Sequence, residues 1–409
     1  MPWKECCVVT ERAKFVMEWE RRWKEARGRV DLAELCRRFG ISRQTGYVWV
    51  KRYREGGHDV RALDNRSSRP KTSPTVTSAA NVETILAARR DHPRWGPRKL
   101  VAWLRDRHPS REFPSAATAR RILERHGMVS RRRRRRRRAA VPGAPFSEAT
   151  RPNAVWCIDF KGAITTGDGQ RCGPLTIVDA FSRFCIRCEL LPEATSEYVM
   201  RVLDGAFREY GLPAAVRSDN GPPFASTGAG GLTRLSAWLL RLGIRLERIT
   251  PGSPQENGRL ERFHRSLEHE AASPPKLTWQ AQRRAFYLFR VEYNEERPHE
   301  SLGMKTPASV YVPSASTYPT MLARFEASTF GMSRPVDRQG FIKIDKARVL
   351  ISAALAGESV QLEPNGNRWE VCFGPLLLGW IVAASPTKLN LRTRPRRSNY
   401  VEVSGTSWR

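Results

Sequence analysis

The sequence predicts a mixed α/β domain in the middle of the chain, with two helical units before it and a small all-β unit after it. Three observations support this fold class. Apolar residues recur at helical spacing over residues 31–129, strand-like and helical patterns alternate over 152–249, and short β-like runs separated by turns follow residue 330. A chain of 409 residues is long enough for two to four domains.

The charge of the chain limits the kinds of partner that it can have. The formal net charge is +30 at pH 7. A charge of this size favours a polyanionic partner, most often nucleic acid, with an anionic membrane surface as the alternative. No stretch approaches the roughly 18 apolar residues of a membrane span, and the N-terminal residues open no long apolar run. We therefore expect a nucleic-acid partner, no membrane segment and no signal peptide.

The 8 cysteines are scattered through the chain, which favours reduced thiols in a cytoplasmic protein over a disulfide framework. Cys185 and Cys188 have the spacing of two zinc ligands. However, no second Cys/His pair lies at zinc-finger distance, and both residues fall in a strand-like run. We therefore expect no zinc site.

Residues 31–54 are typical of a helix-turn-helix motif within an N-terminal domain of residues 1–66. Asp31 and Ser42 are suited to cap its two helices, and Gly40 can adopt the positive φ of the turn. In the second helix we expect an inward face with Thr45, Val48 and Trp49 and an exposed face with Arg43, Gln44 and Tyr47. Exposed side chains near the start of such a helix reach base edges in the DNA major groove, although an ordinary two-helix corner gives the same pattern.

One glycine lies inside the second helix of this motif. Gly46 is expected to cost about 1 kcal/mol relative to Ala, because glycine loses more backbone freedom on folding. We therefore expect a weak point in the middle of this helix.

Residues 76–130 are predicted to form a second helical unit. Trp95-Gly96-Pro97 interrupts its helical pattern, and Pro114-Ser115 begins its last helix. In that helix we expect Ile122 and Leu123 to face inward and Arg120, Arg121 and Arg125 to face outward. The unit is either a second DNA-binding helix-turn-helix domain or a plain helical spacer.

Residues 131–151 form a predicted linker that begins with an unbroken run of arginine from Arg131 to Arg138. Such a run cannot bury itself and is disordered alone. It is either a solvated linker or a strap along a phosphate backbone, with an affinity that falls steeply with salt. Contacts of this kind do not read sequence.

The central domain is expected to span residues 152–315. Its predicted elements are, in chain order, strands at 154–160, 175–179 and 184–191, a helix at 197–210, a strand at 214–217, a helix at 232–242 and a strand at 244–249. This order is typical of a mixed α/β domain.

The C-terminal segment, residues 330–409, is expected to form a small all-β barrel. Its β-like runs lie at 341–344, 348–351, 359–362, 369–373 and 376–382. The segment Pro364-Asn365-Gly366-Asn367 is typical of a turn between two of them. The basic ending at 392–397 is a further candidate for contact with a polyanion.

Three acidic residues stand where a strand ends or a helix begins. Asp159 ends a hydrophobic strand, Asp219 follows a strand in the turn Ser218-Asp219-Asn220-Gly221, and Glu261 lies a few residues into a helix. Carboxylates at one sheet edge can hold two divalent cations, which stabilise charge on the attacking and leaving oxygens of phosphoryl transfer. Each residue also has an ordinary interpretation: a strand end, a turn, and an ion pair with Arg265.

The order of these motifs resembles the insertion-sequence transposases that share the catalytic core of retroviral integrases. The resemblance covers residues 152 to about 312 and rests on Trp156-Cys157-Ile158-Asp159, Val178 to Arg183, Ser218 to Gly221 with Phe224, Pro254 to Phe263, Tyr293-Asn294, Arg297-Pro298-His299 and Thr306-Pro307-Ala308. It implies a ribonuclease-H-like fold for the central domain. It also implies that Asp159, Asp219 and Glu261 are the catalytic residues and the ligands of two Mg²⁺ or Mn²⁺ ions.

The third ligand has a rival. The family's usual spacing from the second Asp falls near Gln255 or Glu256. We favour Glu261 because it keeps the Asn-Gly-x-x-Glu register and lies inside the helix. The surplus residues are easily placed in the loop 226–231, where insertions cost little.

The resemblance further implies a DNA transposase associated with the nucleoid. Such a protein binds the terminal repeats of its element, cleaves a phosphodiester, joins the 3′-OH to target DNA and assembles as a homo-oligomer on DNA. Two alternatives are a catalytically idle DNA-binding regulator derived from a transposase and a nuclease that hydrolyses without joining.

Other polar residues of the central domain have weaker assignments. Contacts with DNA phosphates are expected from Asn257, Arg259, Arg262 and Arg265. We expect Asp179 to be structural, and His264 to lie in the core or contact DNA rather than to be catalytic. His299 belongs to a family motif but has no assigned role.

Overall fold

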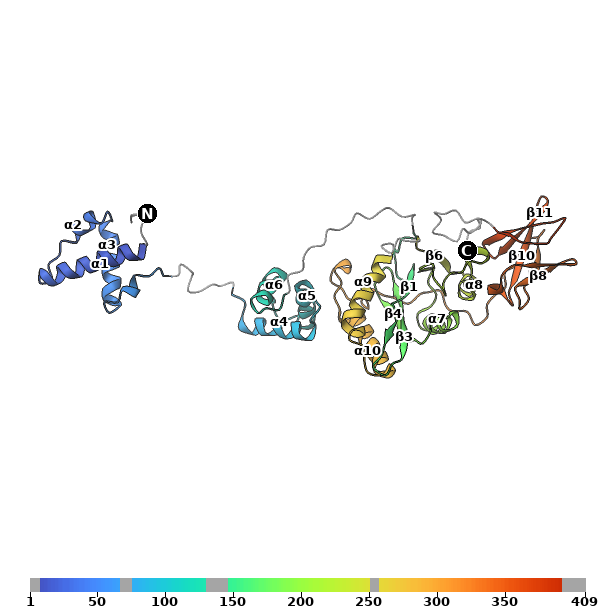
Figure 1. The fold of residues 1–409 in the computed structure, drawn as a ribbon, viewed down its shortest axis with the longest axis horizontal. Helices are drawn as coiled ribbons and strands as arrows, with labels where there is room; N and C mark the ends of the chain where they lie inside the picture. The colour runs from blue at the N-terminus through green and yellow to red at the C-terminus, as the bar shows by residue number, and fades with distance from the viewer. Residues whose placement is uncertain (1–7, 67–75, 130–145, 251–256, 392–409) are drawn as a thin grey trace. The chain divides into compact units, whose positions relative to one another are not determined.

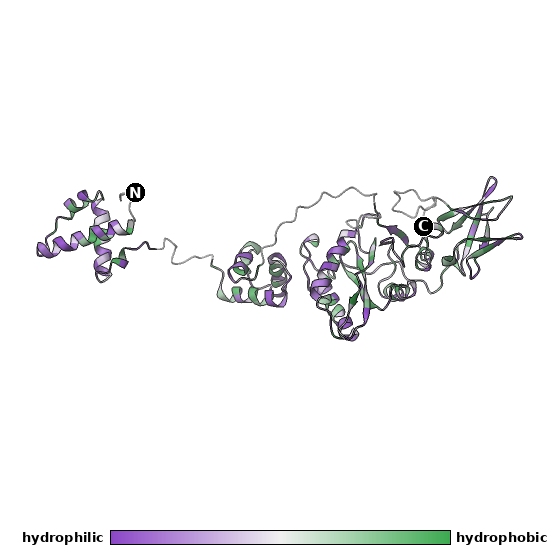
Figure 2. Cartoon of the chain, in the orientation of Figure 1, coloured by the Kyte–Doolittle hydropathy of each residue, from purple (hydrophilic) through white to green (hydrophobic). Residues whose placement is uncertain are grey.

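The computed structural model describes residues 8–66, 76–129, 146–250 and 257–391. The chain divides into two compact units, Met1–Val76 and Thr77–Arg409 (Figure 1). Helices of both units carry hydrophilic and hydrophobic residues in alternation (Figure 2), as expected of helices with one buried face. Within the described residues, no helix is both long and apolar enough to cross a membrane.

The first unit contains α1 Val8–Glu25, α2 Leu32–Arg38, α3 Arg43–Glu55 and the short 3₁₀ helix η1 Val60–Leu63. The Asp31 side chain accepts hydrogen bonds from two backbone N–H groups of α2, and Ser42 accepts one from the N–H of Thr45 in α3. Gly40 in the turn has a φ of +66°. The helix-turn-helix prediction is therefore confirmed. The sequence prediction did not include α1, whose Phe15 is fully buried.

The inward face of α3 differs from the prediction at one position. Val48 is exposed, whereas Trp49, Val50 and Tyr53 are buried. The helix turns by about 100° per residue, so positions 49, 50 and 53 share the face that packs on α1 and α2, and Val48 lies outside it. The prediction that Val48 faces inward is wrong.

Gly46 belongs to the buried face of α3. A Cβ at this position would lie 2.4 Å from Sγ of Cys36 and 3.1 Å from Cζ of Phe15. The absence of a side chain therefore allows α3 to approach α1 and α2 closely, which the sequence prediction of a weak point missed.

The second unit begins with three helices, α4 Ala79–Asp91, α5 Pro97–Arg107 and α6 Ala116–Arg125. Their shared core contains Ile85, Trp95, Leu100, Leu104, Ile122 and Leu123. The Ser115 side chain accepts a hydrogen bond from the N–H of Thr118 and caps α6. Arg120, Arg121 and Arg125 are exposed, as predicted.

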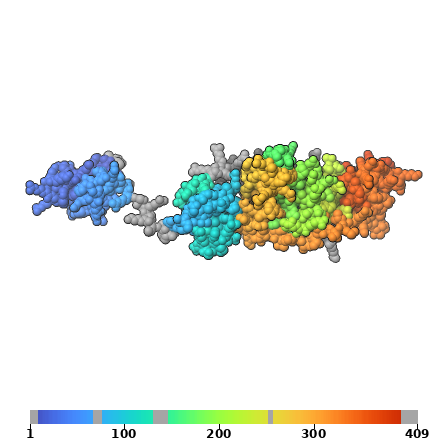
Figure 3. All heavy atoms as spheres, turned by 90° about the horizontal axis from the view of Figure 1, so that it is seen from below, coloured from blue at the N-terminus to red at the C-terminus, as the bar shows by residue number. Residues whose placement is uncertain are grey.

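These helices contact the central domain through polar pairs. Nδ1 of His92 lies 3.0 Å from Oε1 of Glu292, and Arg107 pairs with Glu296 at 3.0 Å. In the space-filling view, the atoms of α4 and α5 abut those of the central domain (Figure 3).

The central domain is built on a mixed six-stranded sheet. Its strands are β1 Trp156–Phe160, β2 Ile164–Thr165, β3 Arg171–Asp179, β4 Cys185–Leu191, β5 Ala215–Ser218 and β6 Arg245–Arg248. The order is β2-β3-β1-β5-β6, and β4 also pairs with β3. The β2, β1 and β4 strands run antiparallel to β3, whereas β1, β5 and β6 run parallel. This is the ribonuclease-H-like sheet that the sequence predicts.

Helices cover both faces of this sheet. On one face, α7 Ser196–Tyr210 and α8 Arg234–Arg241 pack against Trp156 and Ile158 of β1. On the other face, α9 Gly258–Leu267 and α10 Trp279–Val291 pack against Cys157. Successive side chains of a strand point to opposite faces, so Asp159 shares the α9 face with Cys157.

The described part of the C-terminal segment consists of β-strands and one short 3₁₀ helix, η7 Ala353–Leu355. Its strands are β7 Met332–Pro335, β8 Phe341–Ile344, β9 Ala347–Leu350, β10 Ser359–Asn365, β11 Arg368–Phe373, β12 Leu376–Val382 and β13 Asn390–Leu391. Five of them pair in the order β13-β12-β11-β10-β7, and β8 pairs with β9. The five predicted strands are present, while a closed barrel stays a prediction that this pairing does not confirm.

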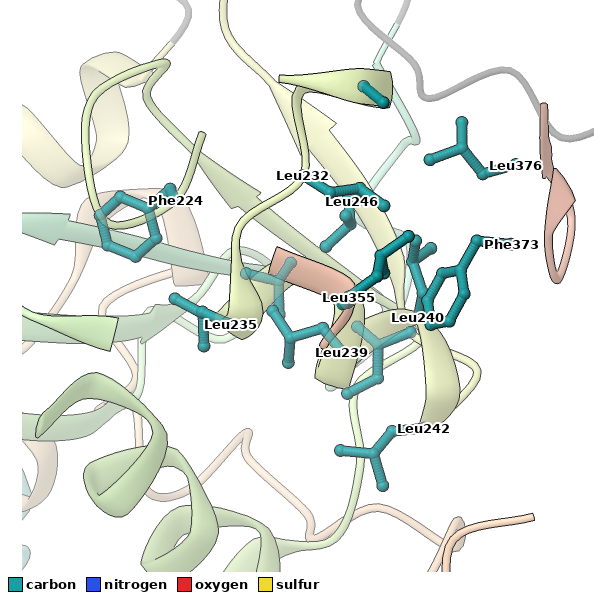
Figure 4. Packing of buried hydrophobic residues seen from close by; sticks show 14 of the residues in the cluster. Phe224, Leu232, Leu235, Leu239, Leu240, Leu242, Leu246, Leu355, Phe373 and Leu376 are labelled. Carbon is teal, nitrogen blue, oxygen red and sulfur yellow. The ribbon is translucent and has the colours of Figure 1, made fainter. Parts of the chain in front are cut away.

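The core of the C-terminal strands is continuous with that of the central domain (Figure 4). The short helix η2 Ala229–Gly231 lies in the loop where the sequence placed the surplus residues, and it packs against β12. A Cβ on Gly230 would lie 2.9 Å from Cδ2 of both Leu376 and Leu378. The extra residues of the loop therefore form a close contact with the C-terminal strands.

Candidate active site

Asp159 and Asp219 stand at the ends of adjacent parallel strands. In the register of β1 and β5, Cys157 pairs with Arg217. Two residues further along the chain, Asp159 lies next to the last residue of β1 and Asp219 directly follows β5, so both lie at the same edge of the sheet. The sequence prediction of convergent strand ends agrees with this register.

Glu261 lies in the first turn of α9, on the sheet face that Asp159 shares. Leu260, Phe263 and Leu267 are buried under this helix, whereas Glu261 is exposed. These buried side chains hold α9 against the sheet, and the carboxylate of Glu261 lies on the exposed side of the helix. The rival residue Glu256 lies outside the described residues.

The charges of the three carboxylates interact. Burial raises the pKa of Asp159, and the negative charges of Asp219 and Glu261 raise it further, to about 6, although a hydrogen bond from the N–H of Phe160 opposes the shift. This N–H donates to Oδ1 of Asp159 at 2.8 Å. The carboxylates of Asp219 and Glu261 therefore both act on Asp159, and a bound cation would relieve this repulsion.

The donor set suits a hard divalent cation, since Mg²⁺ and Mn²⁺ prefer carboxylate oxygens and Mg²⁺ keeps several water ligands. In the described ranges, no three His, Cys, Asp or Glu side chains are grouped closely enough to hold one ion. Glu261 is exposed in the first turn of its helix.

The Asp219 turn is held by contacts on both sides. The N–H of Gly221 donates to Oδ1 of Asp219 at 3.1 Å, and the Asn220 side chain donates to the carbonyl oxygen of Ile249 after β6. Phe224 is buried, and its ring centre lies 6.0 Å from that of Phe160. These contacts fix the loop that carries Asp219 beside the end of β1.

A hydroxyl bridge connects α9 to β1, and sequence reasoning missed it. Oγ1 of Thr176 donates to the carbonyl oxygen of Asp159 at 3.2 Å and lies 2.7 Å from Nε2 of His264. Burial, with a smaller effect of Lys161, lowers the pKa of His264 to about 4, so its ring is neutral. His264 is therefore a positioning residue at the α9–β1 contact. In the sequence, the one signal for this role is that His264 follows Glu261 by one helical turn in α9.

Asp179 is structural, as expected. Its oxygens accept hydrogen bonds from the N–H of Asn153 at 2.8 Å and from both the N–H and hydroxyl of Ser182, at 2.7 and 2.6 Å. Burial raises its pKa. The residue ties the turn after β3 to the segment before β1.

The four residues near Glu261 that were expected to hold DNA phosphates divide into two sets. Arg265 lies one turn after Glu261 on the same side of α9. Arg259 and Arg262 line a cavity on another side of the helix. Asn257 is buried at the start of α9, and its Oδ1 has no hydrogen-bond partner among the described residues.

The predicted DNA-contacting residues of the first unit are Arg43, Gln44 and Tyr47, and all three are exposed at the start of α3. The run from Arg131 to Arg138 and the basic ending at 392–397 lie outside the described residues. Cys185 and Cys188 are buried in β4 as free thiols.

The comparisons with known proteins agree with this architecture. Protein-family models described as integrase core domains match residues 149–254 and 242–307. A helix-turn-helix domain model matches residues 12–71, and a homeodomain-like domain model matches 45–123.

Two relatives come from bacterial insertion elements. The uncharacterized 31.7 kDa protein of insertion element IS407 from Burkholderia multivorans is 33% identical over 233 residues, which cover 55% of this chain and 79% of that protein. The uncharacterized 39.2 kDa protein of IS476 from Xanthomonas euvesicatoria is 32% identical over 239 residues, which cover 58% of this chain and 65% of that protein.

Among solved structures, the HTLV-2 integrase catalytic core domain in complex with magnesium is similar at 17% identity and a TM-score of 0.31. The match covers 40% of this chain and 99% of that one. The insertion-element relatives, the integrase core matches and the helix-turn-helix matches identify the family. The chain belongs to the insertion-sequence transposases that combine an integrase core domain with helix-turn-helix domains.

Proposed function

We propose that this chain is a DNA transposase that binds the ends of its element, cleaves a phosphodiester there and joins the resulting 3′-OH to target DNA. The observation that carries the proposal is the parallel register of β1 and β5. It brings Asp159 and Asp219 to one sheet edge, where the charge of Glu261 also acts on Asp159. Such a carboxylate group suits phosphoryl transfer.

The reaction has two steps at the same residues. In the first, a water oxygen bonds to phosphorus at the element end, the P–O3′ bond breaks, and the departing 3′-oxygen takes up a proton. In the second, that 3′-OH attacks a target phosphodiester in line and displaces the target 3′-oxygen. One phosphodiester forms for each that breaks in the second step, so no external energy source is needed.

Asp159, Asp219 and Glu261 would hold two Mg²⁺ or Mn²⁺ ions through their carboxylate oxygens. When bound, the ions supply charge stabilisation at the attacking and leaving oxygens. The Asn220 and Phe224 contacts keep the Asp219 carboxylate in place, and Thr176 and His264 keep α9 against β1. Arg265, on the same side of α9 as Glu261, would hold a phosphate of the reacting strand.

Recognition of the element ends is assigned to the helical units. Arg43, Gln44 and Tyr47 would contact base edges from the start of α3. The run from Arg131 to Arg138 would add affinity without reading sequence. Cleavage and joining of two element ends requires more than one active site, so we propose that the chain acts as a homo-oligomer on DNA.

One assay distinguishes this function from the two alternatives. The purified chain is incubated with Mg²⁺, a labelled duplex that carries the end of its element and a supercoiled target plasmid. A transposase gives label joined to the plasmid. A nuclease gives only the cleaved end, and a DNA-binding regulator gives only a shifted band. Either of the last two results would overturn the proposal.

A further inference from the structure

A cavity of about 640 Å³ lies beside α9, on a different side of the helix from Glu261. Positions 259, 262 and 266 are three to four residues apart and line it together, whereas 261 and 265 follow another side of the helix. The basic residues at its wall are Lys99 from α5 and, from the central domain, Arg183, Arg259, Arg262, Arg297 and His299. The cavity is thus formed jointly by the second helical unit and the integrase core.

The positive charge of the cavity is not balanced by carboxylates. Glu300 lines the cavity and Glu270 lies near it, and both have a basic partner: Glu270 pairs with Arg297 at 2.6 Å, and Glu300 lies 3.7 Å from Arg98. In residues 76–129, 146–250 and 257–391, none of the other four cationic wall residues has a carboxylate within 4 Å. An excess of positive charge therefore faces the cavity.

The guanidinium groups are held in place by uncharged oxygens. Arg183 and Arg259 donate from Nη1 to the same carbonyl oxygen, that of Ala180, at 2.7 and 2.9 Å. Arg297 also donates from Nη2 to the hydroxyl of Ser266 at 3.2 Å. A guanidinium has five N–H donors, so each group retains donors for a further acceptor.

Burial lowers the pKa of two wall residues, Lys99 and His299. Burial and the nearby charge of Arg297 lower the pKa of Lys99 to about 8. Burial also lowers the pKa of His299 to about 3, and its buried Nε2 has no hydrogen-bond partner in the described part of the chain. Gly258, at the positive end of the α9 dipole, lines the same cavity.

We propose that this cavity binds a phosphate group of a DNA strand, with Lys99 and Arg262 as ligands from its two sides. Phosphate matches the recessed cationic wall, because guanidinium groups bind its oxygens in a fixed geometry. The bound phosphate would join the second helical unit to α9, the helix that carries Glu261. The choice of DNA as the source of the phosphate rests on the proposed function.

The test measures DNA affinity of the full chain without divalent metal, so it does not depend on cleavage. Lys99→Gln, Arg262→Gln and the double variant are compared with Arg284→Gln, an exposed arginine on α10. Binding of a labelled duplex is titrated at several salt concentrations. Circular dichroism and thermal melting establish that each variant is folded.

If both residues bind one phosphate, each single variant loses roughly tenfold in affinity, and the slope of log affinity against log salt falls by about 1. The double variant is then little weaker than either single variant, since both changes remove the same contact. Arg284→Gln stays within about twofold of the unmodified chain. Single variants that match Arg284→Gln, or losses that simply multiply in the double variant, would overturn the proposal.

A second experiment tests whether the phosphate bound in the cavity belongs to DNA or to a free phosphate compound. Inorganic phosphate is compared with chloride at equal ionic strength by thermal melting of the same proteins. Stabilisation by phosphate that Lys99→Gln and Arg262→Gln abolish, together with loss of DNA affinity, supports the proposal. Stabilisation without any loss of DNA affinity assigns the cavity to a free phosphate compound and overturns it. Coupled affinity losses in a chain that neither cuts nor joins DNA would leave this inference standing while the proposed function fails.

Discussion

At the level of single residues, the candidate site disfavours the ionised form of one carboxyl group, that of Asp159. Asp159 is partly buried beside Asp219 and within the influence of Glu261, and its pKa is raised to about 6. The hydrogen bond from the N–H of Phe160 offsets only part of this cost. A group whose pKa is raised by folding contributes to stability at low pH and loses that contribution as the pH rises through its folded pKa.

The first prediction concerns this pH dependence. Without divalent metal, Asp159→Asn should raise the free energy of unfolding at pH 7.5 by up to about 3 kcal/mol, since folding raises the pKa of Asp159 from 3.8 to about 6 and each tenfold change in acid strength is worth about 1.4 kcal/mol. The difference should shrink as the pH falls below 6 and vanish near pH 3, below the ordinary Asp pKa of 3.8, where Asp159 is protonated in folded and unfolded chains alike. Urea unfolding at each pH measures it.

The matched control is Glu193→Gln, which removes an exposed carboxylate after β4 and should leave stability within about 0.5 kcal/mol. Equal stability of Asp159→Asn and the unmodified chain at pH 7.5 would show that neither burial nor the charges of Asp219 and Glu261 disfavour the ionised form of Asp159 in the folded protein.

At the level of secondary-structure elements, the packing of a helix against its neighbours determines which side chains fit at the contact. α3 crosses α1 and α2 at Gly46, where a Cβ would meet Sγ of Cys36 at 2.4 Å. α9 is fixed by Leu260 and Phe263 on the sheet and by the bridge from Thr176 to His264. In both helices, buried residues with no assigned function set the position of the residues that we propose to contact DNA or to hold the metal ions.

The second prediction distinguishes helix propensity from packing at Gly46. Propensity alone predicts that Gly46→Ala stabilises the helix by about 1 kcal/mol. The contact with Cys36 predicts instead a loss of about 1–3 kcal/mol, typical of an overpacked core. Thermal melting of the first unit within the full chain decides between them.

Two companion variants sharpen this test. Cys36→Ala combined with Gly46→Ala should recover part of the loss, because it removes the sulfur that the new methyl group meets. Val48→Ala, at the exposed position of the same helix, should change stability by no more than about 0.5 kcal/mol. A stabilised Gly46→Ala variant would mean that α3 does not pack as described.

At the level of the whole molecule, the charge of +30 is spread over units with different tasks. Exposed arginines of α6 and the wall of the α9 cavity belong to the second unit, while Arg43 belongs to the first. The run from Arg131 to Arg138 connects the helical part of the second unit to its catalytic part along the sequence. We expect these groups to act additively on non-specific DNA affinity.

The third prediction concerns this arginine run. Replacing Arg131–Arg138 with serine should reduce the slope of log affinity against log salt by up to about 7, since each phosphate contact contributes about 0.9. The effect should be the same on duplexes of unrelated sequence, because phosphate contacts do not specify bases. Replacement of the run with lysine, which keeps the charge, is the control and should preserve most of the slope. An unchanged slope in the serine variant would identify the run as a solvated linker.

Local patterns sufficed for some features of this molecule. The apolar runs around 154–160 and 214–217 locate the strands that end near Asp159 and Asp219, and helix caps at Asp31 and Ser42 are visible in the sequence because they depend on neighbouring residues only. The face of α9 that carries Glu261 follows from helical periodicity. The positions of Asp159 and Asp219 at the ends of two strands and the helix-turn-helix could therefore be predicted.

Contacts between distant segments could not be predicted in this way. The Thr176–His264 bridge joins residues 88 positions apart, and no local pattern marks it. The contact of Gly230 with β12, the burial of Gly46 and the position of Lys99 and Arg262 in the wall of one cavity likewise depend on tertiary packing. The exposed position of Val48 shows the same limit. An apolar residue next to the buried face of a helix does not reveal which face the neighbouring helices cover.

The most direct test of the proposed catalytic group is a strand-transfer assay on a labelled element end with Mg²⁺. Asp159→Asn, Asp219→Asn and Glu261→Gln should each lower both end cleavage and joining by about a thousandfold, or about 4 kcal/mol of transition-state stabilisation, with DNA affinity retained. Glu256→Gln and Glu193→Gln should remain active. Loss of activity in Glu256→Gln alone among the two glutamate candidates would move the third ligand to Glu256, and full activity of Asp159→Asn would contradict the assignment of the site.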